Sequence, residues 1–252
     1  PQPGIVPHEL KALFSQLLRS GLDIRDMNCV RKRFTRWGGG RLARSLAHAR
    51  VGCYILSDVI GDDLAAIGSG PAVPDPATAR DVRDALVRAG LWDGLGPSLR
   101  QHLDDVECGR IPETPKPGDP AFDRVESTLI ATNRLALEAA GRRASEAGLV
   151  PEIIESPLVG EAVIAGTRIA ERLRAAETED NVSRCLILGG ETTVTIADDG
   201  AGIGGRSQEL ALAAARILRG MPAAALLAAG TDGRDGPTDA AGAIVDGTTW
   251  ER

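Results

Sequence analysis

The sequence contains few aromatic residues, only three lysines and no long hydrophobic run. Phe, Trp and Tyr make up 3% of its 252 residues, although hydrophobic residues make up 43%. A core must therefore be built from Ala, Leu, Ile and Val, which typically fill helix-covered parallel sheets. No apolar run approaches the ~20 residues that a membrane span needs, so we expect no membrane partner. Any phosphate chemistry that depends on lysine is limited to Lys11, Lys32 and Lys116.

Basic charge and clustered cysteines are also lacking. The formal net charge is −6 at pH 7, so no basic surplus indicates a nucleic-acid partner. The four cysteines form no CxxC pair and no zinc spacing, and the three histidines share no metal-ligand spacing. This pattern predicts buried thiols of a cytoplasmic protein rather than disulfides.

Several catalytic signatures are missing. The sequence has no G-x-x-x-x-G-K-[ST] segment, which excludes a P-loop kinase, and it has no H-R-D or D-F-G segment, which excludes the protein-kinase pattern. Ser57 and Ser69 lack a nucleophile elbow and a histidine partner, which argues against hydrolase chemistry.

Apolar periodicity predicts alternating helices and strands. Helical patterns cover residues 8–20, 41–49, 79–89, 123–147, 161–175 and 207–218. Strand-like runs cover residues 51–56, 149–155, 185–188, 192–197, 223–229 and 243–245. Such alternation is typical of layered α/β folds. Residues 185–188 and 192–197 are so close in sequence that they favour a hairpin over a parallel unit.

A charged connector at residues 177–180 indicates a boundary between two domains. We expect a larger α/β domain over residues 1–180 and a smaller one over residues 181–252. Within the larger domain, four prolines prevent residues 112–120 from forming a helix or a central strand. This segment is either a rigid connector or the wall of an active-site loop. Residues 31–33, Arg-Lys-Arg, are either a solvated basic turn or an anion contact.

The most informative stretch follows the apolar run 223–229. Three aspartates, Asp232, Asp235 and Asp239, lie within eight residues of each other on a glycine-broken loop. Ligands of open α/β sheets bind outside the carboxyl ends of strands, and carboxylates there suit a magnesium nucleotide or a polar substrate. A solvated Asp-Gly turn is the alternative. Asp58 and Asp62 follow another strand, 51–56, in the same way, although helix capping also explains such acids.

A glycine-rich segment, residues 200–205, opens the helix expected at 207–218. Free N–H groups at a helix start can bind a phosphate, and Arg206 adds a bidentate cation. A solvated hairpin loop is the alternative. As a dinucleotide fingerprint the segment is weak, because no parallel βαβ unit is expected around it.

Together these segments resemble the glycerate 2-kinase family. The matching stretches, in family order, are residues 20–32, 39–43, 56–63, 69–76, 113–120, 189–193, 205–210 and 230–242. The resemblance implies a layered, Rossmann-like larger domain and a smaller α/β domain, with the active site in the cleft between them. It also implies transfer of the ATP γ-phosphate to the 2-hydroxyl of D-glycerate, with Mg²⁺.

The site residues predicted on this basis come from both expected domains. Arg206 and Asp232 are predicted to be catalytic. The predicted substrate- or nucleotide-binding residues are Arg31, Ser69, Glu191, Thr192, Gly205, Asp235 and Asp239. The predicted metal ligands are Asp58, Asp62 and Asp232. The sequence does not separate the metal ligand from the general base.

The sequence departs from the family pattern in three places. The family's glycine-lysine loop, which supplies a lysine implied to be catalytic, is expected before Pro1, and the C-terminal end is also expected to be missing. Gly38 stands where the family usually has lysine, and Ser207 where it usually has asparagine. Two alternatives therefore stay open: an inactive fragment with a binding or scaffold role, and an NAD(P)-dependent hydroxypyruvate reductase. We expect small-molecule partners and a cytoplasmic location, and a homodimer is compatible with the sequence.

Overall fold

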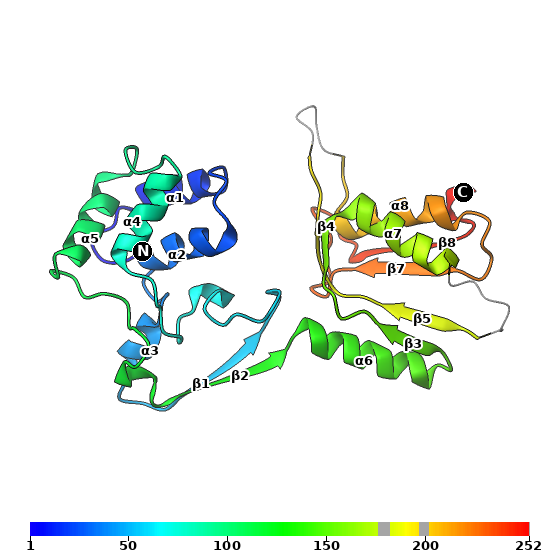
Figure 1. Ribbon diagram of the computed structural model, residues 1–252, viewed down its shortest axis with the longest axis horizontal. Helices are drawn as coiled ribbons and strands as arrows, with labels where there is room; N and C mark the ends of the chain where they lie inside the picture. Colours follow the sequence, from blue (N-terminus) through cyan, green and yellow to red (C-terminus); the bar gives the residue numbers. More distant parts are fainter. Residues whose placement is uncertain (176–181, 197–201, 252) are drawn as a thin grey trace. The chain divides into compact units, whose positions relative to one another are not determined.

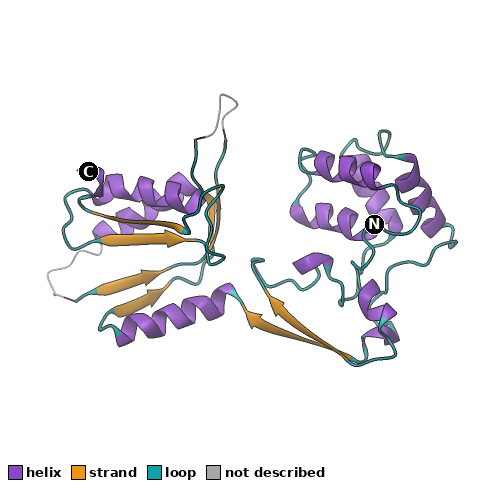
Figure 2. Ribbon diagram, turned by 180° about the vertical axis from the view of Figure 1, so that it is seen from behind, coloured by secondary structure: helices purple, strands orange, loops and turns teal. Residues whose placement is uncertain are grey.

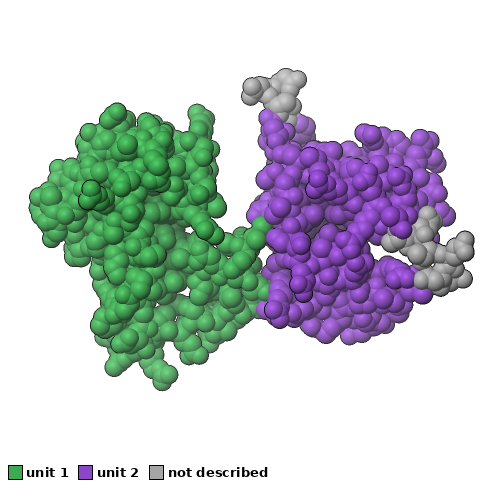
Figure 3. All heavy atoms as spheres, viewed as in Figure 1, with its two compact units in different colours: residues 1–132 green, residues 133–252 purple. Residues whose placement is uncertain are grey.

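The computed structural model describes residues 1–175, 182–196 and 202–251. The chain divides into two compact units, residues 1–132 (unit 1) and 133–252 (unit 2), shown in Figure 3. The boundary predicted near residue 180 lies inside unit 2, and residues 176–181 are outside the described residues, so a domain division there stays a prediction. In the described part of the chain, every helix is too short or too polar to cross a membrane.

Unit 1 is mainly helical (Figures 1 and 2). Its helices are α1 (Pro7–Leu17), α2 (Ile24–Phe34), α3 (Arg41–Ser45), α4 (Ala79–Arg88) and α5 (Pro97–Glu107), with 3-10 turns η1 (Ile67–Ser69) and η2 (Pro120–Phe122). Helices α1, α2, α4 and α5 share one core, which includes Leu13, Val30, Phe34 and Leu99. The expected helices 8–20 and 79–89 correspond to α1 and α4.

Local sequence explains where several of these helices begin. Helix α2 starts after Asp23, whose carboxylate accepts a hydrogen bond of 2.8 Å from the N–H of Asp26. Helix α4 starts with a capping box between Thr78 and Asp81. Helix α5 starts at Pro97, whose fixed φ suits the first helical position.

The only sheet among the described residues of unit 1 has two parallel strands, β1 (Val51–Leu56) and β2 (Val125–Ala131). Strand β1 agrees with the sequence, but the helix expected over residues 123–147 is wrong in its first third. That stretch forms β2, and α6 (Asn133–Glu146) begins only at residue 133. The β-branched Val125, Thr128 and Ile130 favour a strand once β1 is available as a partner.

Among its described residues, unit 2 combines strands with α6 and with two further helices that pack against each other. Its remaining elements are β3 (Val150–Ile153), β4 (Leu158–Glu161), α7 (Ala162–Ala175), β5 (Arg184–Ile187), β6 (Gly190–Thr193), α8 (Arg206–Leu218), β7 (Ala225–Ala229), β8 (Gly242–Asp246) and the turn η3 (Thr249–Glu251). Helices α7 and α8 lie side by side (Figure 1), so close that a side chain at Gly166 would overlap the carbonyl of Leu210. Their shared face is built largely of alanine.

The strands of unit 2 pair differently from the sequence prediction. Strands β5 and β6 do not form a hairpin: β5 pairs in parallel with β3, and β6 pairs in parallel with β4. Gly189 and Gly190 carry the chain from one pair to the next, and the N–H of Leu158 donates to the Gly189 carbonyl at 2.9 Å. A side chain at Gly190 would overlap Leu158, so this glycine serves a close backbone approach rather than a tight turn.

All four cysteines are free thiols, as the sequence predicts. Their predicted burial is wrong: Cys108 is exposed, and Cys29, Cys53 and Cys185 are partly accessible.

Candidate functional site

The aspartate loop of unit 2 is anchored to the start of helix α8 by Asp235. This side chain is 3% exposed. Its carboxylate accepts hydrogen bonds from the backbone N–H groups of Ser207 (2.9 Å) and Gln208 (2.8 Å) and from Nε2 of Gln208 (3.0 Å). Burial acts to raise the pKa of Asp235, but these donors outweigh it and hold the pKa below its usual value.

Gly205 makes this anchor possible, because a Cβ at that position would overlap the Asp235 carboxylate. The sequence leaves two interpretations of this helix start, free N–H groups that bind a phosphate or a solvated hairpin loop, and in the structure two of these N–H groups are occupied by Asp235. An intramolecular carboxylate therefore binds the N–H groups that the first interpretation gives to a phosphate. Residues 200 and 201 of the glycine-rich segment lie outside the described residues.

Arg206, the first residue of α8, forms an ion pair with Glu191 of β6, in which Nη1 donates to Oε1. Both side chains are about half exposed, at 51% and 53%. The neighbouring Thr192 is buried. The structure thus brings five predicted residues, Glu191, Thr192, Gly205, Arg206 and Asp235, to the junction of β6 with α8.

Asp232 and Asp239 lie on the same loop but are exposed. The carboxylate of Asp232 accepts a hydrogen bond of 3.2 Å from the N–H of Arg234, which closes a local turn. Over residues 1–175, 182–196 and 202–251, no three His, Cys, Asp or Glu side chains gather into a set that could hold a metal ion. Mg²⁺ held by substrate phosphates needs only one or two protein carboxylates, and Asp232 and Asp239 are accessible for that role.

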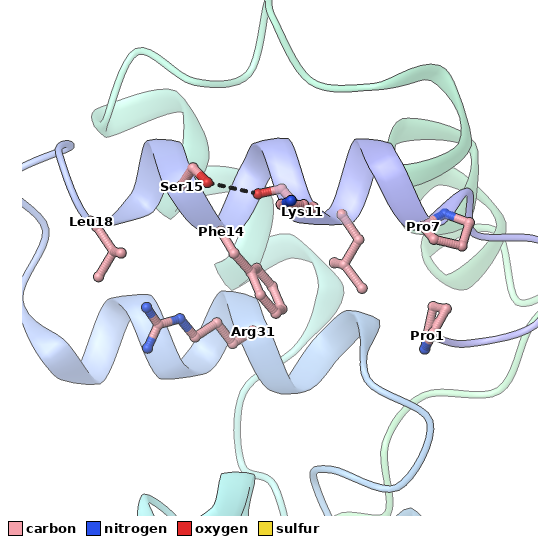
Figure 4. A pocket seen from close by; sticks show the side chains of 8 residues that line it. Pro1, Pro7, Lys11, Phe14, Ser15, Leu18 and Arg31 are labelled. Atoms are coloured by element: carbon pink, nitrogen blue, oxygen red, sulfur yellow. Dashed lines mark hydrogen bonds between the residues drawn. The ribbon is translucent and has the colours of Figure 1, made fainter.

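The predicted residues of unit 1 are more widely spread. Arg31 lies within α2, not in a solvated turn, and its guanidinium carbon is 5.8 Å from the ring centroid of Phe14 on α1. Arg31 lines a mostly apolar pocket of about 380 Å³. Figure 4 shows its side chain near those of Phe14, Leu18 and Pro1, which line the same pocket. Burial leaves its Nε without a partner among the described residues.

Asp58 and Asp62 lie in the loop after β1, where Asp58 is exposed and Asp62 adopts a positive φ of 54°. Ser69 ends η1 with a φ of 67°. Whether any of these residues joins the loop of unit 2 in one site stays a prediction.

Sequence reasoning missed a buried charge network in unit 1, centred on Arg33. Arg33 is fully buried; Nη1 donates to the Glu113 carboxylate, and Nη2 donates to the Ala77 carbonyl at 2.9 Å. The other Glu113 oxygen accepts from the N–H of Ala79 at 2.7 Å, at the start of α4. Burial acts to raise the pKa of Glu113, but the Ala79 N–H and the Arg33 guanidinium together lower it to about 2.

Asp75 extends the network. Its carboxylate lies 3.4 Å from Nζ of Lys32 and accepts a hydrogen bond of 3.0 Å from the Thr114 hydroxyl. Nζ of Lys116 donates to the same Thr114 oxygen at 3.0 Å and to Glu113 at 3.2 Å. The proline-rich segment 112–120 is thereby fastened to α2. The sequence contains one signal of this buried network: Lys32 and Arg33 lie between the apolar Val30 and Phe34, in a pattern that continues the helix.

Arg41 completes the network from the other side. Its guanidinium donates to the carbonyls of Lys32 (3.0 Å), Arg33 (3.1 Å) and Gly38 (3.2 Å), which satisfies the end of α2. Burial lowers the pKa of Arg41 to about 10, so the side chain stays charged at neutral pH. The contacts of Arg33 and Arg41 are thus largely internal and hold α2, α4 and the proline-rich segment together.

Two family models match the chain. A domain of unknown function (DUF4147) matches residues 1–104, and the MOFRL family matches residues 184–252.

Similar proteins of known sequence and structure span nearly the whole chain. A glycerate 2-kinase of Pyrococcus horikoshii is 41% identical, covering 100% of this chain and 57% of its own length. A glycerate kinase of Macaca fascicularis is 31% identical, covering 97% and 71%. A relative from Agrobacterium vitis with a provisional hydroxypyruvate reductase name is 39% identical, covering 93% and 52%. The crystal structure of a glycerate kinase from Thermotoga maritima matches with a TM-score of 0.86 at 40% identity, covering 100% of this chain and 58% of that one.

Proposed function

Because the chain belongs to the glycerate kinase family, we propose that it serves the ATP-dependent phosphorylation of D-glycerate to 2-phosphoglycerate. The chain spans 57% of the length of the Pyrococcus relative, so the activity, its substrates and its partners belong to this proposal. The observation that carries it within the chain is the Arg206–Glu191 pair beside the anchored aspartate loop.

Arg206 is the residue best suited to bind an anionic reactant. Phosphoryl transfer depends mainly on charge neutralisation and positioning. A planar guanidinium binds phosphate or carboxylate oxygens through two parallel hydrogen bonds, and that of Arg206 is half exposed. Asp235 holds the backbone directly after Arg206, so the guanidinium is presented from a fixed helix start. We assign Arg206 to the transferring phosphoryl group or to the glycerate carboxylate.

Asp232 and Asp239 supply the exposed carboxylates of the same loop. Either one can accept the proton of the attacking hydroxyl or hold Mg²⁺, and Asp232 lies nearer the end of β7. When bound, Mg²⁺ would neutralise charge on the phosphate oxygens. Arg31, Ser69, Asp58 and Asp62 of unit 1 are proposed to contribute to substrate or metal binding. A cytoplasmic location and a homodimer stay predictions.

A coupled assay tests the proposal directly. The protein is incubated with Mg-ATP and D-glycerate, ADP release is followed, and the product is identified by ³¹P NMR. We expect 2-phosphoglycerate, and exclusive formation of 3-phosphoglycerate would contradict the assigned regiochemistry. Oxidation of NADH by hydroxypyruvate without ATP turnover would favour the reductase. Absence of both activities would favour a non-catalytic fragment.

A further inference from the structure

Unit 1 contains a hollow of about 510 Å³, and among its lining residues only Ser69 has so far been proposed to bind a ligand. It is lined by Thr35, Arg36, Trp37 and Gly38 from the turn after α2, and by Ser69 and Pro71 from the loop around η1. The two segments are joined by the backbone, because the N–H of Gly39 donates to the Ser69 carbonyl at 2.9 Å. The hollow therefore has walls fixed by hydrogen bonds within one unit.

Arg36 places at this hollow a guanidinium that stacks on a neighbouring ring but has no ion-pair partner among the described residues. Its guanidinium carbon lies 4.6 Å from the ring centroid of Trp37, which is a cation–π contact. Within the described residues, Arg36 forms no ion pair and no hydrogen bond through its side chain. Stacking restricts the guanidinium while its N–H edges stay available, which is the state in which arginine recognises carboxylate and phosphate groups.

Ser69 adds a hydroxyl in a strained position. Its φ of 67° lies in the left-handed region, which is unfavourable for a residue with a Cβ. No side chain or carbonyl of the described residues bonds the Ser69 hydroxyl. A strained polar residue in a hollow is a reason to look for a ligand, and the hydroxyl can donate one hydrogen bond to it.

The electrostatic surroundings favour an anion. The carboxyl end of α2 would repel one, but Arg41 binds the carbonyls of Lys32, Arg33 and Gly38 at that end. The charge network of unit 1 contains Lys32, Arg33, Arg41 and Lys116 against Asp75 and Glu113. This leaves an excess of positive charge close to the turn that carries Arg36.

We propose that this hollow binds a small anion, with the Arg36 guanidinium and the Ser69 hydroxyl contacting its carboxylate or phosphate oxygens. The identity of the anion rests on the proposed function, which offers the glycerate carboxylate and the phosphates of ATP. The existence of the site rests on unit 1 alone.

NMR titration of the ¹⁵N-labelled protein tests the site. Inorganic phosphate and D-glycerate are added separately at constant ionic strength, with chloride as the reference anion. We expect saturable shifts of the Trp37 indole N–H and the Ser69 amide, without shifts of the other two indole signals. A larger response to D-glycerate would identify the carboxylate as the anion bound, and a larger response to phosphate would identify a phosphate group.

Matched variants make the test specific. Arg36→Ala removes charge-assisted hydrogen bonds and should raise the Kd at least about tenfold. Arg36→Lys keeps the positive charge but lacks the planar N–H edges, so its Kd should lie between those of the wild type and Arg36→Ala. Arg25→Ala changes an exposed arginine in the first turn of α2, the helix that precedes the Arg36 turn, and should leave the Kd unchanged.

Two results would overturn the proposal: shifts that do not saturate, or equal Kd values for Arg36→Ala and Arg25→Ala. If Ser69→Ala binds like the wild type, the role of the hydroxyl is wrong. A protein that binds the anion but transfers no phosphate would contradict the proposed function and leave this site standing. A protein that phosphorylates D-glycerate but binds no anion at Arg36 would contradict this site and leave the proposed function standing.

Discussion

Arg206 holds its guanidinium half exposed against one carboxylate, whereas Arg33 and Arg41 are buried among several acceptors. An exposed ion pair contributes only about 0 to 1 kcal/mol. Glu191 can therefore give way to a phosphate or carboxylate at little cost, while the buried arginines cannot be released without losing several hydrogen bonds. This difference in exposure leaves Arg206 accessible to the anion proposed to bind there, whereas Arg33 and Arg41 are occupied by internal contacts.

Substitution of Arg206 should affect activity more than folding. An arginine that stabilises a transferring phosphoryl group can contribute about 10³-fold or more to the rate. We expect Arg206→Ala to lose activity on this scale, and Arg206→Lys to recover little of it, because an ammonium cannot make the planar two-point contact. Turnover and melting temperature are measured together, with Arg216→Lys in the last turn of α8 as the control. Normal turnover in both variants would show that Arg206 is a surface cation with no role in the reaction.

His102 should make unit 1 sensitive to acid. Its side chain is 5% exposed, and neither ring nitrogen has a partner among the described residues. Burial, with the nearby Arg41 and Arg33, lowers the pKa of His102 to about 4 from 6.5. Between these two pH values His102 is protonated in the unfolded chain but neutral in the folded chain. The free energy of unfolding therefore falls as the pH drops from about 6.5 to 4, by about 3 kcal/mol in order of magnitude.

Urea unfolding at pH 7, 5 and 4, followed by NMR signals of residues 1–132, measures this dependence. In His102→Leu, the free energy of unfolding should change little with pH above pH 4.5. Glu113, with its pKa lowered to about 2, contributes stability that is lost only as pH falls from about 4.5 to 2. An unchanged slope between pH 6.5 and 4.5 in His102→Leu would show that another group is responsible.

At the scale of elements, α8 depends on a residue that is distant in sequence. Asp235→Asn should weaken the acceptor for Ser207 and Gln208 and destabilise unit 2 by about 1 to 3 kcal/mol. Hydrogen exchange of those two amides should accelerate more than exchange in the middle of α8. Asp239→Asn, an exposed change on the same loop, should leave both quantities unaltered. Equal exchange in the two variants would mean that Asp235 does not anchor the helix.

At the scale of the whole molecule, the parallel strand pairs determine which segment can fold alone. Residues 133–252 contain both members of each pair, β3 with β5 and β4 with β6, together with the α7–α8 core. Residues 181–252 contain only one member of each pair and lack α7. We expect the longer segment to give a dispersed ¹⁵N spectrum with cooperative unfolding, and the shorter one to be largely unfolded. A folded 181–252 segment would support the boundary predicted near residue 180.

The sequence determined the features that depend on local pattern or on motif order. The periodicity of α1, α4 and α8 predicts these helices because a buried face repeats every 3.6 residues. The ordered motifs identified the glycerate kinase family, and that prediction is confirmed. The aspartate loop was also recognised from its position after the apolar strand β7.

Which of these polar residues are available to a ligand depends on contacts that form only in the folded chain. Residues 125–131 became a strand because β1 pairs with them, and β5 and β6 paired with earlier strands rather than with each other. Asp235 and Asp232 look alike in sequence, yet one is buried as a helix cap and the other is exposed. Burial and strand pairing arise from contacts between residues far apart in the chain, and no local pattern of residue types encodes them.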